Sequence, residues 1–288
     1  MTNHIQFPGL GLECTINRVA FTIFGLPIYW YGLILTAALM LSAFVAFRMA
    51  KKFNIDEDRL IDVVMIGAVG AIICARAYYV AFAPFEYDSF FDMINIRDGG
   101  IAIYGAVIGA FVIGGLACKW RKLDVLNVFD ITATCFLLGQ GIGRWGNFVN
   151  QEAFGTNTTA PWGMISEGTS AYLQSVQGTL AAQGVIVDPS MPVHPTFLYE
   201  SLWCLLGFCL LMLYFKNRRF KGEMVCLYAI WYGVGRYFIE ALRTDSLETV
   251  GGIRTSQLVA LITVAAGVAI IIIMRYIKKK KSDQVKES

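Results

Sequence analysis

Polar and charged side chains gather in one short run of an otherwise apolar chain, the sequence GRWGNFVNQEAFG at positions 143–155. If this run is helical, the i, i+3, i+7 spacing of Arg144, Asn147 and Gln151 places them on one face. Glu152 then lies at the margin of that face. An arginine beside amides and a carboxylate suits the binding of an anionic head group. The alternative interpretation is a polar turn that caps one membrane span and opens an extracytoplasmic loop.

The composition identifies the class of protein. The chain has 288 residues, of which 56% are hydrophobic and 16% charged, and its mean hydropathy is +0.57, as is typical of integral membrane proteins. The net charge is only +3 and the basic residues lie beside apolar stretches, so we do not expect nucleic-acid binding. The seven cysteines have no CxxC motif and no ligand-like spacing to His4 or His194. We therefore expect no disulfide framework, no metal and no other cofactor, and the first 27 residues contain no evident removable signal peptide.

Seven apolar stretches are long enough to cross the hydrocarbon layer, which takes roughly 20 residues. We therefore predict an all-α integral membrane protein with seven transmembrane helices in a single membrane domain, residues 1–288. Residues 156–193 form a predicted extracytoplasmic segment and 282–288 a polar cytoplasmic tail. Residues 84–96 are either an amphipathic interfacial helix or an ordinary aromatic loop. The predicted spans are about 28–47, 60–82, 100–120, 125–142, 196–215, 223–242 and 255–277.

Basic clusters follow the first, third, fifth and seventh predicted spans, whereas the other loops carry few basic residues. By the positive-inside rule these ends are cytoplasmic. We expect a multi-pass protein of the bacterial cytoplasmic membrane with its N-terminus outside and its C-terminus in the cytoplasm. The clusters contain Arg48, Lys51, Lys52 and Arg59; Lys119, Arg121 and Lys122; Lys216, Arg218, Arg219 and Lys221; and Arg275 with Lys278 to Lys281.

This topology brings further polar side chains to the same depth as the run at 143–155. Arg76 and Arg236 each lie inside a predicted span, a few residues from its outer end, where an ionisable group is costly unless it faces a cavity or a partner. Glu240 and Arg243 follow Arg236 by four and seven residues and share its helical face. The other candidates stand at the outer ends of their spans: Tyr29, Tyr31, Tyr104, His194, Tyr199 and Glu200.

Each candidate also has a purely structural explanation. Arg236 and Glu240 can form an ordinary ion pair within a helix, and Arg243 can extend to the interface. Arg76 can lock two helices by pairing with a carboxylate, and His194 can cap the fifth span. The glycines at 99–115 and 139–143 favour close helix packing, although Gly99-Gly100 can also bring backbone N–H groups near a ligand. It is the coincidence at one depth that favours a functional site.

Taken in order, the motifs of the chain resemble those of bacterial prolipoprotein diacylglyceryl transferases. The resemblance covers nearly the whole chain and is most specific in the run at 143–155, where the defining positions are Gly143, Arg144, Asn147, Asn150, Glu152 and Gly155. One departure concerns Tyr104, where many members of the family carry a histidine regarded as a candidate base. The other matching motifs are YWYGL at 29–33, the arginine of CARAYY at 74–79, DGGIAIYG at 98–105, HPTFLYE at 194–200 and YGVGRYFIEALR at 232–243.

The resemblance implies transfer of the diacylglyceryl group of phosphatidylglycerol to the lipobox cysteine of a prolipoprotein signal peptide, with release of glycerol phosphate. A thiol of pKa near 8.5 must become a thiolate, and the departing phosphate gains negative charge. Arginine suits both needs, so we assign Arg144 and Arg236 to the phosphodiester. Asn147 and Glu152 would hold the head-group glycerol or orient Arg144. Tyr104 would act as the base or orient the thiol.

The remaining assignments follow the same resemblance. Glu240 would fix Arg236, while Arg243 would dock the head group or gate access to the site. The other expected substrate-binding residues are Arg76, Tyr31, His194, Tyr199 and Glu200. Two other classes of protein fit the pattern less well: a lipid transporter should show inverted repeats and broken helices, which the sequence lacks, and a receptor-like protein needs no convergent charge.

Overall fold

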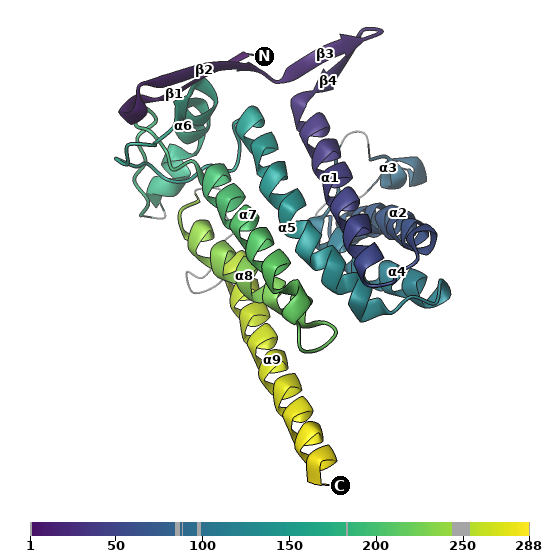
Figure 1. Cartoon of the computed structure of the whole chain (residues 1–288). Coiled ribbons are helices and arrows are strands. Elements are labelled where there is room, and N and C mark those ends of the chain that lie inside the picture. Colours follow the sequence, from purple (N-terminus) through teal and green to yellow (C-terminus); the bar gives the residue numbers. More distant parts are fainter. Residues whose placement is uncertain are drawn as a thin grey trace. The chain divides into compact units, whose positions relative to one another are not determined.

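The computed structural model describes residues 2–83, 87, 89–96, 99–182, 184–243 and 254–287. These residues form two compact units, one with the residues up to 44 and those from 132 onward, the other with residues 45–131. Both units are mostly helical (Figure 1). Within the described ranges, six helices are long and apolar enough to cross a membrane. The chain is therefore built as a multi-pass membrane protein.

Most of the predicted spans match helices to within a few residues. α5 runs eight residues further than predicted, because the polar run after position 142 continues the helix to Asn150. α9 includes most of the predicted polar tail, whose glutamine, lysine and glutamate are good helix formers. The spanning helices are α1 Trp30–Lys52, α2 Glu57–Ala81, α4 Ile103–Trp120, α5 Val125–Asn150, α7 Thr196–Tyr214 with the 3-10 turn η2 Phe215–Asn217, and α9 Thr255–Glu287.

The sixth predicted span corresponds to α8, Glu223–Ala241. α8 is not among the six apolar helices, because Arg236 and Glu240 interrupt its apolar sequence near its C-terminal end. Its place as a seventh span therefore remains a prediction.

The all-α prediction omits five short strands. β1 Thr2–Phe7 pairs antiparallel with β2 Leu12–Asn17, and β5 Ile165–Ser166 adds to its other edge. β3 Val19–Ile23 and β4 Leu26–Tyr29 form a separate hairpin that leads into α1. The two residues of its turn, Phe24 and Gly25, both have positive φ, as in a type I′ turn. Pairing between these strands provides hydrogen-bond partners for the backbone N–H and C=O groups, and this stabilises the extended conformation of the N-terminal residues.

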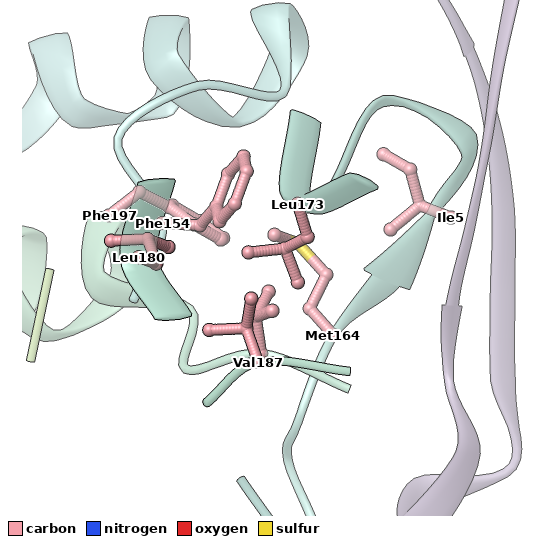
Figure 2. Close-up of a cluster of buried hydrophobic side chains, with 8 residues drawn as sticks. Ile5, Phe154, Met164, Leu173, Leu180, Val187 and Phe197 are labelled. Atoms are coloured by element: carbon pink, nitrogen blue, oxygen red, sulfur yellow. The ribbon is translucent and has the colours of Figure 1, made fainter. Parts of the chain in front are cut away.

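A hydrophobic core joins the N-terminus to the segment 156–193 (Figure 2). Ile5 of β1 is fully buried and packs in the same cluster as Leu173 and Leu180 of α6, Glu167–Ala182. In this core the segment 156–193 packs against β1, a partner that the sequence did not indicate. The other members of the cluster are Phe154, Met164, Val187, Val193 and Phe197.

Two tryptophans join α7 to α8 by a reciprocal contact. The indole N–H of Trp203 donates to the carbonyl oxygen of Trp231 over 2.9 Å, and the indole of Trp231 donates to that of Trp203 over the same distance. The two rings stack with centroids 4.3 Å apart. A Cβ at Gly207 or Gly235 would lie 2.2 Å from the facing indole nitrogen, so only glycine allows this approach. The contact fixes the distance between the two helices.

In the unit of residues 45–131, α2 and α4 pack closely through glycines. A Cβ at Gly105 would lie 2.4 Å from the carbonyl oxygen of Cys74, and one at Gly109 would lie 2.6 Å from the Cys74 side chain. The predicted role of these glycines in helix packing is confirmed. The short helix α3, Phe90–Ile94, covers part of the predicted interfacial segment; positions 84–86 and 88 lie outside the described residues.

Candidate active site

The carboxylate of Glu200 lies between two arginines from different helices. Glu200 stands in the second turn of α7, and its Oε1 accepts from Nη1 of Arg236 in α8 over 2.8 Å. Its Oε2 forms an ion pair with Nε of Arg144 in α5. The side chain of Glu200 is only 6% exposed, and those of the arginines are 20% and 19% exposed. One buried carboxylate therefore holds two guanidinium groups side by side.

The second carboxylate of this network is Glu240. Its Oε2 lies 2.5 Å from Nη2 of Arg236, one helical turn earlier on α8, and its side chain is 4% exposed. The carbonyl oxygen of Glu240 accepts from Nη1 of Arg254, the residue before α9. The i, i+4 spacing read from the sequence thus corresponds to a real ion pair.

In the other direction the network reaches the end of α5. Nη1 of Arg144 lies 3.4 Å from Oδ1 of Asn147, whose Nδ2 donates to Oε1 of Glu152 over 2.9 Å. Gln151 does not join this face: it follows the last residue of α5, has a φ of 54°, and accepts from the Ser166 hydroxyl over 2.6 Å. The expected shared face therefore holds Arg144 and Asn147 but not Gln151.

A cavity of about 720 Å³ opens beside Glu152. The hairpin residue Arg18, which precedes β3, donates through Nη2 to the Asn150 carbonyl oxygen over 2.7 Å. Its buried Nε has no hydrogen-bond partner among the described residues. Tyr31 also lines the cavity and packs on Gly146, where a Cβ would lie 2.8 Å from the ring. The cavity touches the network at Glu152 and not at the arginine pair.

Sequence reasoning did not identify Arg18 as a candidate. The available signal was a lone arginine shortly before the first span, on the side where the loops carry few basic residues. Nothing in its spacing predicts that strand pairing brings it to the end of α5.

His194 and Tyr199 form a second polar group at the start of α7. Trp162 donates from Nε1 to the Tyr199 hydroxyl over 2.7 Å, and that hydroxyl lies 3.1 Å from Nδ1 of His194. Burial lowers the pKa of His194. The backbone N–H of Gly155 donates to the carbonyl oxygen of His194. Gly155 also forms an isolated β-bridge with Arg243, so the end of the run at 143–155 contacts the residues that follow α8. These residues shape the end of the site through backbone pairing.

Arg76 has a different environment from the one expected. It belongs to the unit of residues 45–131 and donates four hydrogen bonds to carbonyl oxygens, over 2.6 Å to Asp92, 2.7 Å to Met93, 3.0 Å to Gly99 and 2.7 Å to Gly100. Gly100 has a φ of 77°, and a Cβ there would lie 2.3 Å from Nη1 of Arg76. These contacts give Arg76 backbone carbonyl groups as partners, and its expected role in substrate binding stays a prediction. They show that Arg76 binds the segment between α2 and α4, and that Gly99 and Gly100 offer it their carbonyl groups.

Tyr104 lies in the same unit, in the first turn of α4. Its side chain is exposed, and its ring centroid is 6.5 Å from that of Tyr78. The sequence predicts Tyr104 at the same membrane depth as the arginines. The contact described for its ring is with Tyr78, in the same unit, and its predicted role stays a prediction.

The network in α5, α7 and α8 can offer guanidinium donors to an anionic group. Two arginines face two carboxylates, so the buried group is close to neutral. The contacts described use Nε and Nη1 of Arg144 and both terminal nitrogens of Arg236, while guanidinium carries five N–H donors. The remaining donors can bind a phosphate whose charge rises during a reaction. In the described ranges, no three His, Cys, Asp or Glu side chains are grouped so as to hold a metal ion.

Comparison with known proteins gives a consistent result over most of the chain. The family model described as prolipoprotein diacylglyceryl transferase matches residues 18–273. A phosphatidylglycerol–prolipoprotein diacylglyceryl transferase of Finegoldia magna is 42% identical over 275 residues, which cover 93% of this chain and 100% of the relative. One from Clostridium perfringens is 44% identical, over 92% of this chain and 98% of the relative. One from Clostridioides difficile is 37% identical, over 94% and 100%. The match includes the run at 143–155 and the helices α7 and α8, which carry Glu200 and Arg236. This chain therefore belongs to the prolipoprotein diacylglyceryl transferase family.

Proposed function

We propose that this protein transfers the diacylglyceryl group of phosphatidylglycerol to the cysteine thiol of a prolipoprotein, the first step of lipoprotein maturation. The family match supports the reaction. The observation that carries the site assignment is the Glu200 carboxylate that holds Arg144 and Arg236 together in a buried position.

In the proposed reaction a cysteine thiolate attacks the glyceryl carbon that bears the phosphate. A carbon–sulfur bond forms, the carbon–oxygen bond breaks, and glycerol phosphate leaves with the electron pair. The phosphate passes from one negative charge to about two, so fixed cations stabilise the transition state more than the ground state. Arg144 and Arg236 are the groups assigned to that charge, and Glu200 and Glu240 are assigned to their positioning.

The polar residues at the end of α5 are assigned to the head group. Asn147 and Glu152 form a hydrogen-bonded pair next to the cavity of Arg18 and Tyr31. Carboxylate and amide oxygens can accept from the hydroxyls of the head-group glycerol, while Arg18 can donate to its oxygens. The boundary of the proposed substrate site at the start of α7 would be formed by His194 and Tyr199. At the end of α8 it would be formed by Arg243.

The proton of the thiol needs an acceptor, and Tyr104 is the proposed base or orienting group. Its side chain is exposed, and a phenol hydroxyl can both donate and accept a hydrogen bond. We further propose that the protein lies in the bacterial cytoplasmic membrane as one domain with seven spans and an extracytoplasmic N-terminus. In that orientation the arginine pair faces the outer leaflet, and the segment 156–193 lies on the extracytoplasmic side.

The direct test uses the purified protein in detergent micelles with phosphatidylglycerol and a synthetic lipobox peptide. The expected result is loss of the free thiol and a peptide mass increased by one diacylglyceryl group, with release of one glycerol phosphate per product. Phosphatidylcholine in place of phosphatidylglycerol tests the head-group requirement, and a peptide with serine for cysteine tests the nucleophile. Release of glycerol phosphate without a gain of peptide mass would indicate a lipase and contradict the proposal.

A further inference from the structure

A basic cavity lies at the far end of α8 from the arginine pair. It has a volume of about 480 Å³ and is lined by Arg219, Arg275, Tyr276, Lys278 and Lys279. α8 begins at Glu223, next to this cavity, and reaches Arg236 13 residues later, about 20 Å along the helix at 1.5 Å per residue. The cavity is therefore separate from the candidate active site.

A buried carboxylate organises the wall of this cavity. The Glu223 side chain is 0% exposed, and its Oε1 accepts from Nη2 of Arg275 over 2.6 Å and from Nε over 3.1 Å. The Tyr214 hydroxyl lies 3.1 Å from the same Nη2. The backbone N–H of Arg219 donates to the other oxygen of Glu223. The loop after α7, the start of α8 and the middle of α9 thus hold the cations in a fixed arrangement.

The side chains that line the cavity carry four positive charges and no negative one. Glu223 balances the charge of Arg275, and Nζ of Lys278 donates to the carbonyl oxygen of Arg219. About three positive charges remain within one concave surface. Such a surface binds an anion, and arginine with lysine favours phosphate oxygens.

The position of the cavity along α9 indicates the source of the phosphate. The helix is apolar up to Met274 and then reads RYIKKKK. Large apolar side chains are exposed just before this change, at Ile272 and Ile273, and Tyr276 is exposed at the change itself. Tyrosine at such a boundary is typical of the level of lipid head groups. A phospholipid can place its phosphate in the cavity and its acyl chains along the exposed apolar side chains of α9.

We propose that this cavity binds the head group of an anionic phospholipid, in the leaflet opposite to that of the reaction. Arg219, Lys278 and Lys279 contact the phosphate and the anionic part of the head group, while Arg275 stays paired with Glu223. Each lysine near an anionic lipid surface strengthens binding severalfold, so loss of two should weaken binding on the order of tenfold or more. The site does not depend on the transfer reaction.

The test measures lipid retained by the purified full-length protein in native mass spectrometry. Phosphatidylserine is the probe, because phosphatidylglycerol is the proposed substrate and would also bind at the active site. The wild-type protein should retain phosphatidylserine at least about tenfold more than phosphatidylcholine of the same acyl chains. The variant Lys278→Gln/Lys279→Gln should lose most of this preference.

The matched control is Lys280→Gln/Lys281→Gln, which removes the same two charges from the next two positions of α9, outside the cavity lining. It should retain phosphatidylserine within about twofold of wild type. A second variant, Arg219→Gln, alters the loop and not the helix and should also weaken retention. Equal losses in both lysine pairs would reduce the effect to general surface charge and overturn the proposal. Displacement of the lipid by millimolar inorganic phosphate would instead assign the cavity to a free anion and overturn it too.

Discussion

Nη1 of Arg236 lies 2.8 Å from Oε1 of Glu200, and this ion pair crosses from α8 to α7. A buried charge needs such a partner, because removing one member of a buried pair costs about 3–5 kcal/mol. Glu200 uses its second oxygen for Arg144. One buried carboxylate therefore pairs with both arginines that we propose for the phosphate and holds them in fixed positions.

The first prediction concerns the arginine pair. Arg144→Ala and Arg236→Ala should each reduce transfer by at least a hundredfold, because each removes a charge-assisted bond to the phosphate in a site of low dielectric. Arg144→Lys should recover little, since an ammonium cannot reproduce the paired donors of guanidinium. Transfer is measured in membranes adjusted to equal abundance of each variant. Near-normal turnover of either alanine variant would contradict the phosphate assignment.

The second prediction concerns Glu200 itself. Glu200→Gln keeps the shape of the side chain but leaves two adjacent guanidinium groups without their shared carboxylate. We expect transfer to fall at least tenfold, and the melting temperature to fall by several degrees. Glu167→Gln removes an equivalent charge from the exposed first turn of α6 and serves as the control. Unchanged kcat and KM in Glu200→Gln would show that the carboxylate does not position the arginines.

Much of this site could be predicted from sequence, for physical reasons that differ between residues. Arg144, Asn147, Arg236 and Glu240 stand at helical spacings inside or next to apolar stretches, where an unpaired polar group is too costly to be incidental. The central place of Glu200 could not be predicted, because it depends on the contact of α7 with α8 and not on local spacing. Arg18 was missed because strand pairing, which acts over long distances in the chain, brings it to Asn150.

The fold divides in the same way. A long apolar stretch is enough to predict a membrane-spanning helix, so most of the predicted spans match helices. The end of α5 was misplaced because polar side chains do not by themselves stop a helix whose backbone bonds remain satisfied. The core that joins Ile5 to Leu173 depends on two segments about 170 residues apart, and no local pattern signals it.

The third prediction tests the proposed base. Tyr104→Phe keeps the ring and deletes the hydroxyl, so the rate should fall strongly while phosphatidylglycerol binding changes little. Tyr104→His should retain substantial activity, with an optimum shifted to lower pH because imidazole titrates near 6.5. Parental rates for Tyr104→Phe across the pH range would remove the catalytic role of Tyr104 and leave the arginine assignment intact.

The fourth prediction uses the lowered pKa of His194. Because burial favours the neutral ring, the folded protein binds fewer protons than the unfolded chain below pH about 6.5. Stability should therefore decrease as the pH falls from about 6.5 to the folded-state pKa, and remain level above that range. Melting temperatures between pH 5 and 8 test this, with His194→Gln expected to flatten part of the slope. His4→Gln, on the exposed face of β1, is the control; an equal flattening there would contradict the assignment.

The fifth prediction is that transfer needs no metal ion. The arginines supply the positive charge, so chelators should leave the rate unchanged and added zinc or magnesium should not raise it. Activity is followed before and after EDTA treatment and dialysis. Inactivation by EDTA that one specific divalent ion reverses would contradict this prediction.

The paired indoles of Trp203 and Trp231 hold α7 and α8 together, so that the two helices move as one unit. Glu200 lies three residues before Trp203, and Arg236 lies five residues after Trp231. Each is therefore about one helical turn from the tryptophan contact. Separating the helices would break two hydrogen bonds and a stacked contact at once. The Glu200–Arg236 ion pair thus lies between two helices held at a fixed distance, and we expect any movement that admits the proposed lipid substrate to occur in other parts of the protein.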